Sequence, residues 1–212
     1  MSQLVDWQKI FEEKAKSLYP ASDPSHDDLH IRRVVQMALV LAKEEGADEN
    51  IVLPAAYFHD MVNVPKNDPR RSMASRLSGE AAVEYLQSVG YPAQYFDAIK
   101  HAIAAHSFSA NITPQTIEAK VVQDADRLDG LGAIGMARLF TVAGLLQRPY
   151  YDPLDFDAEN RAPDDRLFSI DHFQIKLVKI AATMQTGAAK AEAARRLAFM
   201  RDFIGQMRQE AA

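Results

Sequence analysis

The sequence predicts an all-α protein, and three observations carry this fold class. Apolar residues recur at three- and four-residue steps through most of the chain, which is the period of an amphipathic helix. Clusters of Ser, Asp and Asn precede these stretches, and Gly or Pro follows them, as at helix starts and ends. No segment shows period-two alternation bounded by hairpin turns. We therefore expect a compact multi-helix fold with almost no strand.

The helices can be placed in order along the chain. A first apolar stripe over residues 4–18 stops at Pro20. The turn and N-cap cluster over residues 22–28 begins a second helix, which ends at Gly46. A third helix opens near Asp48. Further helices are expected at about residues 73–90, 92–107, 114–128, 131–147, 170–186 and 188–208.

Two segments are expected to be irregular. A short loop covers residues 63–72, and a longer one covers residues 148–166, with Pro149, Pro153 and Pro163 inside it. Long loops in compact domains are often functional, but a solvated connection explains this one equally well.

Composition indicates an ordinary soluble enzyme. With 212 residues, 48% of them hydrophobic, the chain can bury a full core, and we expect one domain over residues 1–212. A net charge of −5 gives no overall attraction to nucleic acid polymers or to anionic membranes, so neither is an expected partner. No signal peptide and no apolar run of roughly 20 residues is present, so the expected location is cytoplasmic. Monomer and homodimer both stay open.

The most informative pattern is the ordered set His30, His59, Asp60 and Asp126. Each residue alone is weak evidence, because a lone His is more often structural and most Asp residues are solvated. Together, neutral imidazoles and carboxylates form a mixed nitrogen and oxygen ligand set that suits divalent ions. The chain has no Cys, so no thiolate competes for this role.

Helix geometry limits how these four residues can meet. Consecutive helix residues point about 100° apart, so His59 and Asp60 can bind one ion only at the flank of their helix, near its end. The loop beginning near Asn63 suggests that end. His30 belongs to the first turns of the preceding helix, and Asp126 lies late in another. We therefore expect a metal site between three helices, on rigid elements.

These residues resemble the HD-domain metal-dependent phosphohydrolases, in particular a small stand-alone bacterial branch often called YedJ-like. The resemblance covers about residues 22–204. Beyond the four ligands, the similar segments are Ser25-His26-Asp27, Val62-Asn-Val-Pro-Lys-Asn67, His106-Ser-Phe-Ser109, Asp126-Arg-Leu-Asp-Gly-Leu-Gly-Ala133 and His172-Phe-Gln-Ile-Lys-Leu177.

The resemblance implies an all-α fold and metal ligation by His30, His59, Asp60 and Asp126, with Asp124 as the alternative to Asp126. One divalent ion is expected: manganese first, with magnesium, iron, nickel or zinc as alternatives. The implied reaction is hydrolysis of a nucleotide, (d)NTP to (d)NMP and pyrophosphate, by attack of a metal-bound water. A bound ion lowers the pKa of water from 15.7 towards neutrality and offsets phosphate charge.

Phosphates in such a substrate require cations, and a basic loop follows the His59-Asp60 pair. Lys66, Arg70, Arg71 and Arg76 stand there against one acid, Asp68. Arg can bind phosphate through two parallel hydrogen bonds, and Lys acts as a point charge. Lys66 is the first choice because it belongs to the Val-Pro-Lys-Asn motif; Arg70 and Arg71 are further candidates. A solvated loop with surface ion pairs is the alternative.

Two residues near His30 are candidates for substrate binding. Arg33 follows His30 by three residues and shares its helix face, where it could reach a phosphate or pair with a carboxylate behind the ligands. His26 lies four residues before His30 and could line the site from the N-cap turn.

Asp60, His106 and Asp129 are the expected catalytic residues. His106 sits at a probable helix end and could donate to a phosphate oxygen or a leaving group, or could be a packed structural His. Asp129, one turn after Asp126, could accept from a ligand imidazole or relay a proton. His101 is expected to be structural, and a core or surface role is also expected for His172 and Lys176.

Other functions remain open from sequence. A phosphomonoesterase or phosphodiesterase would differ only in which phosphorus is attacked. A binuclear oxygenase or phosphodiesterase would need further His ligands, for which His101 and His106 are available. A non-catalytic nucleotide-binding sensor is the third class, and the complete ligand set argues against it.

Overall fold

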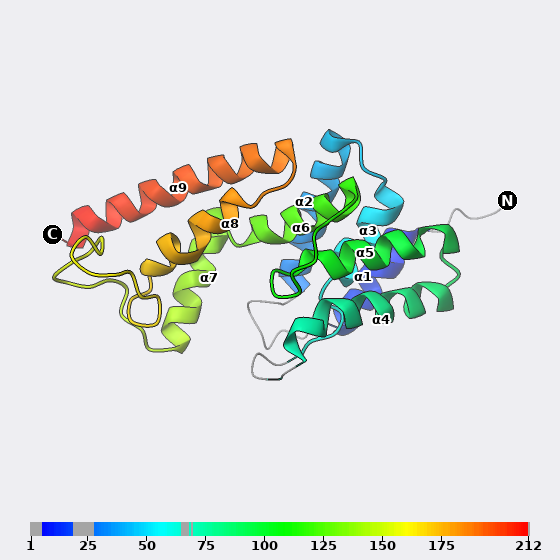
Figure 1. Ribbon diagram of the computed structural model, residues 1–212, viewed down its shortest axis with the longest axis horizontal. Helices are drawn as coiled ribbons and strands as arrows, with labels where there is room; N and C mark the ends of the chain where they lie inside the picture. Colours follow the sequence, from blue (N-terminus) through cyan, green and yellow to red (C-terminus); the bar gives the residue numbers. More distant parts are fainter. Residues whose placement is uncertain (1–5, 19–27, 65–67, 69, 212) are drawn as a thin grey trace. The chain divides into compact units, whose positions relative to one another are not determined.

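The computed structural model describes residues 6–18, 28–64, 68 and 70–211 (Figure 1). Within these ranges every regular element is helical, which confirms the all-α prediction. The elements are α1 (Trp7–Leu18), α2 (Asp28–Glu45), α3 (Glu49–Phe58), the 3-10 turn η1 (Arg71–Met73), α4 (Ala74–Ser88), the 3-10 turn η2 (Ala93–Tyr95), α5 (Phe96–His106), α6 (Ile117–Asp129), α7 (Gly132–Leu145), the π-helical turn η3 (Phe173–Leu177), α8 (Val178–Ala182) and α9 (Gly187–Ala211).

The chain divides into two compact units, residues 1–126 and residues 127–212. The single domain expected over residues 1–212 stays a prediction. Among the described residues no single helix has the length and apolar character to cross a membrane, although the bent pair α6 and α7 meets that test together.

The core of the first unit is an aromatic cluster around Phe11 of α1. Phe11 is fully buried, and its ring lies 5.3 Å from that of Phe58 and 5.6 Å from that of Tyr91, between centroids. Trp7 stacks on Phe11 at 5.9 Å. Because Phe58 is the last residue of α3, this cluster fixes the position of the two residues that follow it.

Helix α3 begins as the sequence predicts and ends earlier. The Asp48 side chain caps it by accepting from Asn50 N–H at 2.8 Å. The loop near Asn63 suggested a later end, but the helix stops at Phe58, so His59 and Asp60 stand just beyond it. Beyond this end, Met61 N–H bonds Phe58 O in a tighter turn at 3.1 Å, and Val62 N–H donates to Ser78 Oγ of α4 at 3.0 Å.

The second unit is held by polar contacts along α9. Arg196 of α9 donates to Leu128 O at 2.6 Å. Gly132 opens α7 with φ at 75°, and its N–H points at Met200 Sδ at 3.1 Å. A Cβ at Gly132 would lie 3.1 Å from Cγ of Arg196, so glycine suits both the backbone angle and the close approach of α9.

Residues 146–170, after α7, contain no helix, as expected for residues 148–166. This segment is nonetheless tied together by Arg161, whose guanidinium donates to both carboxylate oxygens of buried Asp171, at 2.5 and 3.1 Å. Asp152 adds an ion pair at 3.1 Å. The helix expected over residues 170–186 is shorter, reduced to η3 and α8.

Replacing Phe11 by Ala should lower the free energy of unfolding by about 3–5 kcal/mol, because the substitution leaves a cavity in the aromatic cluster. Phe108→Ala is the matched control, since that side chain is 79% exposed, and it should change stability by less than about 0.5 kcal/mol. Urea unfolding followed by circular dichroism measures both. Equal losses in the two variants would contradict the assigned core.

Candidate metal centre

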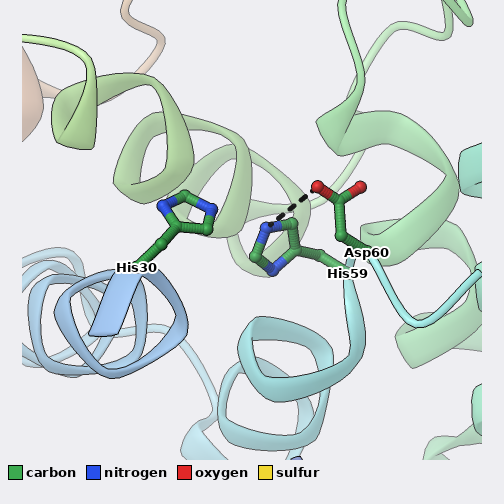
Figure 2. Close-up of side chains that lie close together, drawn as sticks. All are labelled: His30, His59 and Asp60. Carbon is green, nitrogen blue, oxygen red and sulfur yellow. Dashed lines mark ion pairs between the residues drawn. The ribbon is translucent and has the colours of Figure 1, made fainter. Parts of the chain in front are cut away.

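Three helices of the first unit bring the four predicted ligands together. His30 lies in the first turn of α2, and Asp126 lies in the last turn of α6. His59 and Asp60 follow the end of α3. Figure 2 shows the His30 ring beside the His59 ring, with the Asp60 carboxylate on the other side of His59.

The predicted ligand atoms lie close enough together to share one ion. Nε2 of His30 lies 3.6 Å from Asp126 Oδ1, and Nε2 of His59 lies 3.8 Å from the same oxygen. Nε2 of His59 also lies 3.9 Å from Asp60 Oδ2. Ligand atoms of His30, His59 and Asp60 all lie within 4.8 Å of one another. Two atoms bonded to one ion at about 2.0–2.2 Å can be at most about 4.4 Å apart, so the three pair distances fit one ion.

His59 is prepared to bind a cation. Its Nδ1 lies 2.9 Å from Ala56 O, and a carbonyl can only accept, so Nδ1 carries the proton. Nε2 then presents its lone pair, and among the described residues this buried atom has no hydrogen-bond partner. This lone pair lies near the carboxylates of Asp60 and Asp126. A buried nitrogen acceptor beside two carboxylates suits a divalent metal ion, so these residues fit such an ion.

Burial keeps the His59 imidazole neutral. Removal from water lowers the pKa of His59 and outweighs the attraction of Asp60, which acts in the opposite direction. Metal binding requires the neutral ring, so the environment favours the ligating form.

Exposure differs between the two kinds of ligand. The His30 and His59 side chains are 2% and 0% exposed, whereas those of Asp60 and Asp126 are 29% and 27% exposed. The imidazoles therefore form the closed side of the site, and the carboxylates form its accessible side.

His106 joins this cluster at the end of α5. Its Nε2 lies 3.4 Å from Asp60 Oδ1, and its ring centroid lies 4.9 Å from that of His59. Burial lowers the pKa of His106, but the hydrogen bond and charge of Asp60 raise it more, so the pKa is above its ordinary value. The structure thus places the expected catalytic histidine against a predicted ligand.

The other acids of α6 differ in their surroundings. Asp124 is fully buried, whereas Asp126 points into the ligand cluster, so the geometry favours Asp126 as the ligand. Asp129 belongs to the second unit, where Arg138 donates to its Oδ2 at 2.8 Å. This cationic partner was not foreseen from sequence, and the catalytic role of Asp129 stays a prediction.

Two of the predicted phosphate-binding residues, His26 and Lys66, lie outside the described residues. Arg70 makes paired hydrogen bonds to Asp68, at 3.1 and 2.9 Å, and this guanidinium lowers the pKa of Asp68 to about 2. Arg71 donates to Val64 O at 2.6 Å.

The structure also places the remaining candidates. Arg33 is half-buried on α2, one turn after His30. His101 Nε2 accepts from Gln115 N–H at 3.0 Å, a structural contact of the expected kind. His172 Nδ1 lies 2.6 Å from Asp165 Oδ2 in the second unit.

Comparisons with known proteins show the family of this chain. The chain matches the HD domain family over residues 28–131. It is 32% identical to Bacillus subtilis YpgQ over 199 residues, 92% of this chain and 89% of that protein. A solved HD-superfamily hydrolase from Bacillus thuringiensis is 32% identical, with a TM-score of 0.75 and 96% of each chain covered. The structure of Bacillus subtilis YpgQ in complex with ADP has a TM-score of 0.74 at 32% identity, covering 96% of this chain and 94% of that one.

Asp60→Ala should weaken Mn²⁺ binding by more than about tenfold, because the loss of a direct ligand exceeds the loss of a residue that only orients one. Isothermal titration calorimetry measures the affinity, and circular dichroism checks that the helices persist. His101→Gln is the control, since His101 lies in a structural contact outside the cluster, and it should bind as the wild type does. Wild-type affinity in Asp60→Ala would refute the ligand assignment.

Proposed function

This chain belongs to the HD domain family, and from that premise we propose that it is a metal-dependent phosphohydrolase that cleaves (d)NTPs to (d)NMP and pyrophosphate. Its fold is that of an HD-superfamily hydrolase. The observation that carries the proposal is the convergence of His30, His59 and Asp60 with the carboxylate of Asp126, which lies 3.6 Å from His30 Nε2 and 3.8 Å from His59 Nε2. The binding of ADP by the related YpgQ supports a nucleotide as the ligand.

The four converging residues would hold one divalent ion, for which we propose manganese. When bound, such an ion lowers the pKa of water and offsets negative charge on a phosphoryl oxygen. Two imidazoles and two carboxylates would leave positions open in an octahedral ion, which water and substrate require.

His106 is the residue best placed to handle the proton of the leaving group. The bond from its Nδ1 to Ile103 O, at 2.7 Å, fixes the ring so that Nε2 faces the cluster. In the proposed hydrolysis, the oxygen of a water molecule bonds to phosphorus and the water releases one proton to solvent. The bond from phosphorus to the leaving pyrophosphate oxygen breaks, and a proton on Nε2 passes to that oxygen. Asp60, 3.4 Å away, favours the protonated ring.

Cations near the cluster would bind the remaining phosphates. Lys66 remains the first choice from its motif. The fork of Arg70 already pairs with Asp68, which makes it the weaker of the two arginines for this purpose. Arg71 is a cation bound to the loop after Asp60, through Val64 O. Arg33 is a cation one turn after His30 on α2.

The geometry gives little support to the other functions considered from the sequence. A binuclear oxygenase needs further His ligands, and His101 is already engaged with Gln115. Of the two histidines that the sequence offered for a second ion, His101 and His106, only His106 lies at the cluster in the described part of the chain. A phosphomonoesterase or phosphodiesterase would use the same residues and is separated only by its products.

Incubation of the protein with Mn²⁺ and a panel of NTPs, dNTPs and mononucleotides should release pyrophosphate and a monophosphate from at least one triphosphate. Phosphate and pyrophosphate are measured separately. Phosphate without pyrophosphate would support the phosphomonoesterase instead, and absence of turnover on every nucleotide, with metal bound, would refute the proposed function.

Lys66→Ala should reduce kcat/KM by roughly ten- to a hundredfold, as expected for the loss of one charge-assisted hydrogen bond worth about 1.5–3 kcal/mol. Arg70→Ala should have a smaller effect, because Arg70 is paired with Asp68. Mn²⁺ affinity should stay unchanged in both variants, since cations do not bind the ion. Steady-state kinetics decides; a larger loss in Arg70→Ala than in Lys66→Ala would reverse the assignment.

A further inference from the structure

The last turn of α5 is held by side chains from three directions. The final carbonyls of a helix lack intrahelical partners. In α5, Ile103 O lies 2.7 Å from Nδ1 of His106, and Ala104 O accepts from Ser75 Oγ of α4 at 2.9 Å. Ala105 O accepts from Gln123 Nε2 of α6 at 2.7 Å. The turn that ends at His106 is therefore fixed to two neighbouring helices.

Gln123 is an unusual choice for this contact. The residue is 2% exposed, and its Oε1 has no hydrogen-bond partner among the described residues. A buried acceptor left in this state costs free energy, which offsets the gain from the bond made by Nε2. A stabilising role alone does not account for an amide at this position.

The position of Gln123 links two parts of the cluster. It lies one turn before Asp126 on α6, and the carbonyl that it binds belongs to the residue directly before His106. One side chain therefore joins the helix of a predicted metal ligand to the backbone of the predicted proton donor. In this arrangement His106 Nε2 lies 3.4 Å from Asp60 Oδ1.

Helix α4 repeats this arrangement with serines. Ser75 and Ser78 are buried on one face of α4, three residues apart. Ser75 binds the last turn of α5, and Ser78 accepts from Val62 N–H, two residues after Asp60. Both segments that carry the His106 and Asp60 pair are thus anchored to the same helix.

We propose that Gln123 is a positioning residue, which holds Nε2 of His106 at the Asp60 carboxylate through its bond to Ala105 O. This inference rests on the proposed function for the catalytic role of His106. It extends that function by assigning a residue that does not touch the substrate.

The test uses Gln123→Met, which keeps an unbranched side chain and removes both the donor and the unpaired oxygen. The kcat should fall about ten- to a hundredfold, as for a misplaced catalytic group, while KM and Mn²⁺ affinity stay within about twofold. The Tm should shift by no more than about 4 °C. Ser88→Ala is the control, because Ser88 makes the same kind of bond, to Tyr85 O, at the exposed end of α4. It should leave kcat unchanged.

A double-mutant cycle separates positioning from general disturbance. In a His106→Ala background, Gln123→Met should cause no further loss of kcat, because the residue it acts through is gone. Equal losses in both backgrounds would overturn the proposal, as would wild-type kcat in the single variant.

A measurement that does not depend on turnover can test the position of His106 independently of the proposed function. The ring nitrogens of the six histidines can be followed by long-range ¹H–¹⁵N correlation spectra, with Mg²⁺ in place of paramagnetic Mn²⁺. Gln123→Met should shift the His106 nitrogens and leave His101 unchanged, even if no nucleotide proves to be a substrate. If Gln123→Met does not fold, Gln123→Leu decides, since it also removes the donor to Ala105 O; an unchanged His106 signal there overturns the proposal.

Discussion

The bond between a histidine ring and a carbonyl of its own helix is the interaction on which the cluster depends. In His59, Nδ1 is bound to Ala56 O, so Nε2 has to present its lone pair to the carboxylates of Asp60 and Asp126. Burial keeps the pKa of this ring low and the ring neutral. Without that fixed tautomer, the same residues in the same places would not make a cation site.

His106 uses the same arrangement at the end of a different helix, with Nδ1 bound to Ile103 O. Helix ends provide such carbonyls because the last turn lacks intrahelical partners. Rigidity therefore arises differently from what the sequence suggests. His59 and Asp60 were expected near the end of their helix, on a rigid element, yet they stand just beyond α3, and side chains from neighbouring helices bind the segments around them.

Sequence patterns were sufficient for the all-α class, the order of the helices and the set of residues that converge, because periodicity and motif order are local properties. They were not sufficient where a distant partner decides. Ser78 binds the segment after Asp60, Asp68 pairs with Arg70, and Arg138 pairs with Asp129. Gln123 was overlooked because a polar residue in a helix is ordinarily taken to face solvent. The sequence feature that could have indicated its burial is its place between apolar Val122 and the acids Asp124 and Asp126.

The contrast between buried imidazoles and accessible carboxylates also sets an order of events. An anion approaching the cluster first meets Asp60 and Asp126, the two ligands that reach solvent. Like charges repel, so these two carboxylates alone disfavour a phosphate anion. A cation is attracted by the same two groups and offsets their negative charge. Under the proposed function, the ion would therefore enter first or arrive already bound to the phosphates, and free nucleotide in excess over the ion would compete for it.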